Sequence, residues 1–161
     1  MRNLIFSLLF LANLFLMIFK NYVEATEGAF IWHDWYRIST FKCLKDEHTK
    51  EFVFVNANYV DSGEPNLYAE LNIINARAAG IKNVDIYIYP CFKPSEEYKI
   101  CGNGSESITN VLDYFNNINV KYGRVWLYIT LGIDDCKNPS EWDRNNKTKN
   151  MEFIEANFRF F

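Results

Sequence analysis

The spacing of hydrophobic and polar positions changes several times along the chain, and each change predicts a new element. Residues 51–60 are almost continuously apolar, which is typical of a strand buried on both faces. Helical spacing follows, between Pro65 at the expected helix start and Gly80 at its end. The apolar side of this predicted helix consists of Leu67, Leu71, Ile74 and Ala78. The pattern therefore predicts a strand followed by an amphipathic helix.

The same alternation runs through the rest of the chain. In chain order, the further elements expected are a strand at 29–32, a helix at 39–46, a strand at 84–89, a helix at 108–118 capped by Ser105 or Ser107, a strand at 124–131 and a helix at 146–161. Strands and helices that alternate at this spacing predict right-handed βαβ units and a parallel sheet. We expect one α/β domain, since no repeat or linker interrupts the pattern.

The N-terminus has the layout of a secretory signal peptide. A basic residue, Arg2, precedes the apolar run 4–19, and Val23-Glu24-Ala25 suits signal peptidase cleavage after Ala25. A membrane anchor is disfavoured because the run is shorter than the roughly 20 residues that span a bilayer. Residues 26–161 are thus expected to form a secreted protein, free of the membrane after cleavage.

The composition of the chain limits the kinds of ligand it is expected to bind. The formal net charge is −3 and the lysines are scattered, which argues against nucleic-acid binding. No C-x-x-C motif occurs and the histidines are only His33 and His48, so no metal site or cofactor is expected. Glycosylation acceptors occur at Asn103 and Asn146, as suits a secreted chain.

Four cysteines follow the signal segment, and an even count in a secreted chain favours two disulfides with three possible pairings. Cys91 with Cys101 is the preferred local bridge because both flank one loop. Cys43 would then pair with Cys136.

The strand predicted at 124–131 has two distinct faces. Apolar Val125, Leu127 and Ile129 alternate with Trp126, Tyr128 and Thr130, so Tyr128 and Thr130 share a face.

Three segments of the chain resemble the family-25 glycoside hydrolases, the Chalaropsis-type lysozymes, and particularly their invertebrate branch. The segments are 39–44, 75–92, and 120–123 followed by Trp126-Leu127. The resemblance implies a (β/α) barrel with its site at the C-terminal ends of the strands. Such a barrel usually needs 200 or more residues. We therefore expect a partial barrel of the TIM-barrel type, with about four βα units and 26–161 as a truncated lysozyme-like domain.

An open sheet of this kind leaves a strand edge and an apolar face uncovered. A homodimer, a distorted open sheet or a truncated gene product would each account for it.

The resemblance also bears on activity. The family's fourth strand reads Trp-Leu-Asp-Ile-Glu, and here Tyr128 and Thr130 occupy the two acid positions. Neither side chain is a proton donor near neutral pH. Asp34 either matches the family's first-strand Asp or is an exposed loop acid, and Asp134 or Asp135 could act only if a loop turned back.

Tyr59, Tyr89 and Tyr128 are candidates to stack on saccharide rings, whereas Tyr87 is expected in the core. The sequence thus predicts a secreted lysozyme-like protein with little or no hydrolase activity, which acts on bacterial peptidoglycan or a related glycan in defence or digestion. The alternatives are an active muramidase with a relocated carboxylate and a non-catalytic glycan-binding module.

Overall fold

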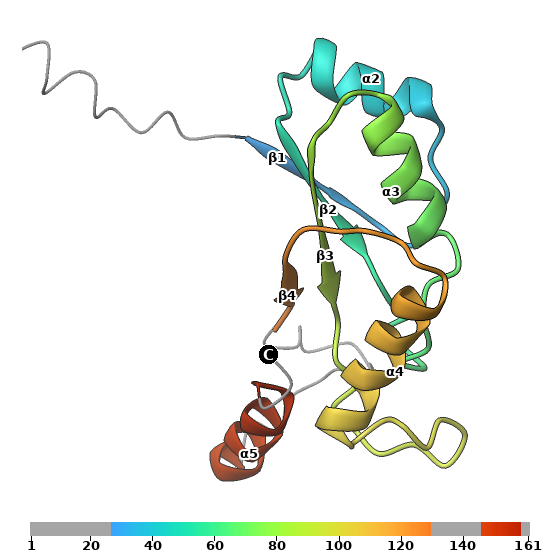
Figure 1. The fold of residues 1–161 in the computed structure, drawn as a ribbon. Coiled ribbons are helices and arrows are strands. Elements are labelled where there is room, and N and C mark those ends of the chain that lie inside the picture. The colour runs from blue at the N-terminus through green and yellow to red at the C-terminus, as the bar shows by residue number, and fades with distance from the viewer. Residues whose placement is uncertain (1–26, 130–145, 159–161) are drawn as a thin grey trace, which may run out of the picture.

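The computed structural model describes residues 27–129 and 146–158, so the predicted signal segment lies outside it. Four parallel strands form one sheet in the order β1-β2-β3-β4 (Figure 1). The strands are β1 (Gly28–Ile31), β2 (Phe52–Asn56), β3 (Asn83–Ile88) and β4 (Val125–Leu127), and the helices are α2 (Ile38–Asp46), α3 (Ala69–Ala78), α4 (Gly104–Asn117) and α5 (Lys147–Phe158). This confirms the α/β class and is consistent with a partial β/α barrel.

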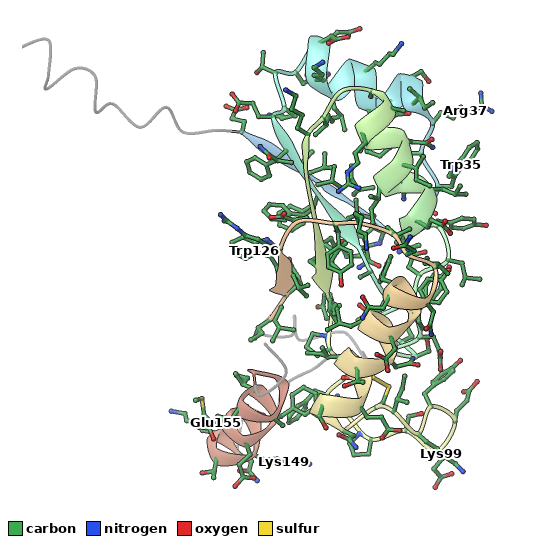
Figure 2. The ribbon with its side chains drawn as sticks, viewed as in Figure 1. Trp35, Arg37, Lys99, Trp126, Lys149 and Glu155 are labelled. Atoms are coloured by element: carbon green, nitrogen blue, oxygen red, sulfur yellow. A yellow bond between two sulfur atoms is a disulfide. The ribbon has the colours of Figure 1, made fainter. Side chains whose placement is uncertain are left out.

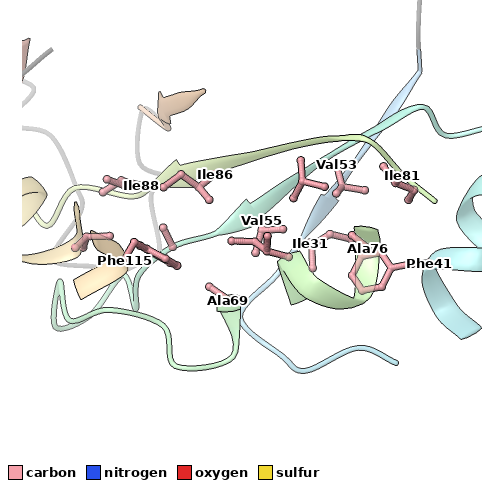
Figure 3. Packing of buried hydrophobic residues seen from close by; sticks show 14 of the residues in the cluster. Ile31, Phe41, Val53, Val55, Ala69, Ala76, Ile81, Ile86, Ile88 and Phe115 are labelled. Atoms are coloured by element: carbon pink, nitrogen blue, oxygen red, sulfur yellow. The ribbon is translucent and has the colours of Figure 1, made fainter. Parts of the chain in front are cut away.

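The hydrophobic core lies between the sheet and α2, α3 and α4. Alternate strand residues Val53, Val55 and Ile86 are completely buried there, and Val55 of β2 and Ile86 of β3 are register partners. Phe41 from α2 and Phe115 from α4 close the core from the helix side (Figure 3). Period-2 alternation in the strands therefore sends one set of side chains into this core and the other to the opposite face.

The second face of the sheet differs from expectation. The strand predicted at 51–60 was expected to be buried on both faces, but Phe52 and Phe54 are only half-buried. The physical reason is that α2, α3 and α4 lie together on one side of the sheet (Figure 1). Apolar side chains on the other side pack against one another instead.

Several predicted boundaries were also wrong. The strand expected at 51–60 ends at Asn56, because Asn58 pairs with Pro65 in an antiparallel bridge. Pro65 does not begin the next helix; Asn66 Oδ1 accepts a hydrogen bond from the Tyr68 N–H, and α3 starts at Ala69.

The helix expected at 108–118 begins earlier, at Gly104, and its cap is neither Ser105 nor Ser107. Asn103 Oδ1 accepts from the backbone N–H of Glu106, which satisfies an N-terminal amide of α4. The strand expected at 124–131 spans Val125–Leu127, and its last two predicted residues lie outside the described part of the chain.

In the part of the chain that the structure describes, no helix has the length and apolar character needed to cross a membrane.

Candidate functional site

The face of the sheet opposite the helices carries a continuous group of aromatic side chains, here called the aromatic face. Its members are Phe30, Phe52, Phe54, Tyr87, Tyr89, Trp126 and Tyr128. Neighbouring rings lie 5.0 to 6.0 Å apart between centroids, within the range of favourable aromatic pairs. Trp126 points away from the helix layer (Figure 2).

Tyr128 lies within this group, at the C-terminal end of β4. Its ring centroid is 5.2 Å from that of Tyr89, 5.7 Å from Tyr87 and 6.0 Å from Phe30. Its backbone N–H still donates to the Ile88 carbonyl at 2.9 Å, so the residue continues the pairing with β3. The ring remains 38% exposed. A phenol surrounded by other rings thus occupies this position, while Thr130 lies outside the described residues.

The tyrosines expected to bind sugar do not all meet. Tyr89 and Tyr128 are in contact, whereas Tyr59 lies beside His33, with 6.5 Å between ring centroids. Asp34 follows His33 in an exposed loop after β1, and its carbonyl accepts from Asn72 Nδ2 at 2.8 Å. Both loops leave the C-terminal ends of their strands, the edge at which parallel α/β sheets bind ligands.

A pair of buried polar groups lies on this same face. Asn56 and Tyr87 are register partners in β2 and β3, and only 4% and 1% of their surfaces are exposed. Among the described residues, neither Asn56 Oδ1 nor the Tyr87 hydroxyl has a hydrogen-bond partner. Burial raises the pKa of Tyr87 to about 12, and the nearby Asn56 side chain offsets part of that effect. Both atoms lie beneath the rings of the aromatic face, next to each other in adjacent strands.

Sequence reasoning missed Asp85, which is the only carboxylate carried by the described strands. Its two oxygens accept from the Arg124 backbone N–H and from Trp126 Nε1, each at 2.8 Å. A Cβ at Gly123 would collide with Asp85 Oδ1, so glycine permits this close approach. The sequence signal that could have revealed Asp85 is the presence of an acidic residue inside the apolar run 84–89. Because both oxygens accept hydrogen bonds from β4 and the residue before it, we assign Asp85 a structural role.

A cavity of about 570 Å³ lies on the aromatic face toward the N-terminal ends of the strands. Phe52, Phe54, Asp85 and Trp126 contribute to its lining. The face is therefore both apolar and hollowed.

One predicted disulfide is confirmed. Cys91 and Cys101 are bonded, with 4.9 Å between their Cα atoms. The second predicted disulfide, Cys43 with Cys136, remains untested because Cys136 lies outside the described residues.

Cys43 Sγ lies 3.6 Å from Glu47 Oε2, and ligand atoms of Cys43, Glu47 and His48 all fall within 4.8 Å of one another on the surface. No metal site was expected from the sequence, and this exposed group is the place in the described chain where ligand atoms converge.

Both predicted glycosylation asparagines are exposed and lie at helix starts. Asn103 Nδ2 donates to Glu106 Oε2 at 2.9 Å, and Asn146 Oδ1 accepts from the Lys149 N–H at 3.0 Å. Their exposure is compatible with modification, which stays a prediction.

Residues 29–159 match the family model described as Lysozyme-like protein 1, which covers all the described strands except the first residue of β1. The chain belongs to the family-25 lysozyme-like proteins. Two relatives illustrate the match. A Dictyostelium discoideum protein named "Probable GH family 25 lysozyme 2" is 31% identical over 119 residues, which are 74% of this chain and 48% of the relative. "Lysozyme-like protein 5" of Caenorhabditis elegans is 30% identical over 142 residues, or 88% of this chain and 58% of the relative.

This lysozyme-like chain spans about half the length of the curated relatives it matches. No solved structure matches it at a significant level.

Proposed function

We propose that this chain is a secreted lysozyme-like protein that binds peptidoglycan or a related glycan and hydrolyses it little or not at all. The observation that carries the proposal is the position of Tyr128, which stands where the family resemblance expects an acid and packs against Tyr87 and Tyr89. Glycoside hydrolysis needs one group to protonate the leaving oxygen and a second to support the oxocarbenium charge. A phenol with a pKa of about 10 is a poor acid at neutral pH.

Glycan binding is supported by the chemistry of the aromatic face. Binding sites for small organic ligands combine apolar and aromatic walls with a few polar groups that fix orientation. The exposed rings of Trp126 and Tyr128 supply the aromatic wall. In this proposal, sugar rings stack on the aromatic face near Tyr89 and Tyr128, and Tyr59 extends the contact along the C-terminal edge.

The proposed setting is extracellular, in antibacterial defence or the digestion of bacteria. The signal-like N-terminus and the Cys91–Cys101 disulfide both support passage through an oxidising compartment. The sequons at Asn103 and Asn146 fit the same route.

A second copy of the chain is the proposed partner for the open edges of the sheet, and in such a dimer Tyr89 and Tyr128 at the C-terminal ends of the strands remain the place where the glycan is bound. Strands β1 and β4 are the two edges of the described sheet, and Phe30 and Trp126 on them are 60% and 43% exposed. A twofold rotation about the axis of the partial barrel would place β4 beside the partner's β1 with all strands still parallel. Closure removes both edges, which open sheets otherwise leave exposed.

The second candidate function is an active muramidase that uses a relocated carboxylate. Asp34 favours it, because this exposed acid lies in the loop after β1, at the edge where the family's site is expected. Asp134 and Asp135 lie outside the described residues.

Two assays on one sample separate these functions. Purified protein is incubated with insoluble peptidoglycan, and we measure the protein retained on the pellet and the soluble fragments released. Retention without release supports the proposal, with Tyr128→Ala expected to weaken retention severalfold and Tyr128→Phe to preserve it, since an aromatic pair contributes about 0.5–1.5 kcal/mol. Release that Asp34→Asn abolishes would support the muramidase instead, and neither retention nor release would contradict both.

A further inference from the structure

A second cavity lies away from the aromatic face, between α4 and the segment that joins β2 to α3. Its volume is about 510 Å³, within the range of small-ligand sites. We call it the α4 groove, and its lining consists of Tyr59, Glu64, Pro65, Leu67, Asn110, Asp113, Tyr114 and Asn117. Figure 1 shows the two elements that form its walls.

The wall contributed by the β2–α3 segment is held in place from several directions. The Asn58 amide donates to the Tyr89 carbonyl and accepts from the Tyr89 N–H, both at 2.8 Å. Asn66 Nδ2 donates to the Asn56 carbonyl at 3.1 Å. Gly63 adopts a φ of +72° and lies so close to the disulfide sulfur of Cys91 that a Cβ would collide with it. A wall fixed in this way loses little conformational entropy when a ligand binds.

The groove is acidic. Glu64 and Asp113 line it, one from each wall, and none of the lining residues is basic. Asn110 Nδ2 donates to Glu64 Oε2 at 3.4 Å, which joins the two walls by a weak hydrogen bond. Burial raises the pKa of Tyr114, and the negative charge of nearby Glu70 adds to the effect, as does Tyr59. The electrostatic environment therefore favours a cation.

The remaining groups indicate what kind of cation fits. Two phenol rings, Tyr59 and Tyr114, line the groove, and aromatic rings attract an organic ammonium. The amides of Asn110 and Asn117 can donate to and accept from hydroxyl groups. Pro65 and Leu67 add apolar surface. Leu67 is 62% exposed, because no other part of the described chain covers it. A hard metal ion such as Ca²⁺ prefers six to eight oxygen ligands and makes no use of aromatic and apolar walls.

We propose that the α4 groove binds a saccharide that carries a free amino group, such as a β-1,4-linked glucosamine oligomer. The ammonium group lies between Glu64 and Asp113, the hydroxyls meet the two asparagine amides, and the flat face of a sugar ring packs on Tyr59 or Tyr114. This inference deepens the proposed glycan binding and rests on it for the class of ligand. It adds a site between α4 and the β2–α3 segment that distinguishes de-acetylated from N-acetylated glycans.

The test uses the full secreted chain and calorimetric titration with two disaccharides, glucosamine dimer and its N,N′-diacetyl form. We expect the free amine to bind at least tenfold more tightly, and Asp113→Asn and Glu64→Gln each to reduce its affinity about threefold to tenfold. Glu155→Gln is the matched control, because Glu155 is an exposed acid on α5 outside the groove (Figure 2). Equal binding of the two disaccharides, or unchanged binding by both groove variants, would overturn the proposal.

Two further measurements keep the outcome unambiguous. If Nα-acetyl-lysine methyl ester binds as tightly as glucosamine dimer, the groove recognises an amine alone and the saccharide part of the proposal is wrong. Retention on fully N-acetylated peptidoglycan separates this site from the aromatic face: Tyr128→Ala should lower retention and leave the glucosamine titration unchanged, and Asp113→Asn should do the reverse. If the parent chain is not retained on peptidoglycan but still binds glucosamine dimer, only the proposed function is wrong.

Discussion

The Tyr128 ring lies 5.2 Å from the Tyr89 ring, tilted by 42°, so adjacent strands end in a pair of phenols at the edge where the family places its acids. A carboxylate at Tyr128 would be surrounded by rings of Phe30, Tyr87 and Tyr89, a setting that disfavours an unpaired charge. The neighbours of Tyr128 therefore suit an aromatic residue. This arrangement supports the proposal that the chain holds a glycan rather than cleaves it.

Ile86→Ala should destabilise the fold strongly. Ile86 is completely buried in the central strand β3, and truncating a buried isoleucine to alanine costs about 2–5 kcal/mol. Ile74→Ala is the matched control, because Ile74 on α3 is 49% exposed and should cost less than about 0.5 kcal/mol. Urea denaturation followed by circular dichroism measures both. Similar losses for the two variants would show that the core is not where the structure places it.

Tyr87→Phe should leave stability at neutral pH unchanged or slightly higher, since the hydroxyl it removes has no partner among the described residues. The effect should grow in alkali. Burial raises the pKa of Tyr87 to about 12, above its ordinary value of 10, so the unfolded chain releases the phenol proton first and the parent loses stability as the pH rises from 10 toward 12, whereas the variant has no phenol to ionise there. Thermal melting from pH 8 to pH 12 measures it. A steeper alkaline loss in the variant than in the parent would contradict this account.

The sequence predicted the order and type of all the described elements, and the reason is their periodicity. Val53, Val55 and Ile86 alternate with other side chains and face the helices, as strand geometry requires. The sequence failed to predict the helix start near Pro65, because Pro65 pairs with Asn58, and the Asn58 side chain is in turn bound to Tyr89 on another strand end.

Strand periodicity also predicted part of the candidate site. Tyr89 and Tyr128 follow from strand ends, whereas nothing local indicates that Asp85 would bond Arg124 and Trp126. The α4 groove was also missed, because its walls are a loop and a helix that are distant in the chain, with Glu64 and Asn110 separated by 46 positions.

The chain should associate in solution. We expect sedimentation at micromolar concentration to show a dimer, because the aromatic face and both sheet edges of the described chain are uncovered. Phe30→Asp should shift the protein to monomer, and Ile74→Asp, an exposed position in the helix layer, should not. A parent protein that sediments as a monomer and unfolds in a single two-state transition would sink the dimer proposal.

The secreted form should begin at Thr26 and contain no free thiol. Cys91 and Cys101 are bonded in the structure, and the remaining prediction is that Cys43 pairs with Cys136. Intact mass after alkylation without reduction should be unchanged, and reduction followed by alkylation should label all four cysteines. Two labels before reduction would show that the second disulfide is absent.

The most direct test of the central claim is release of soluble muropeptides from bacterial cell walls at neutral pH, measured against buffer and against an active family-25 lysozyme. A positioned acid or base typically contributes about 10²- to 10⁴-fold in rate, so a chain with Tyr128 and Thr130 at the acid positions should release no more than the buffer control while remaining bound to the walls. Robust release that Asp34→Asn or Asp134→Asn abolishes would contradict the account and establish a muramidase with a relocated carboxylate.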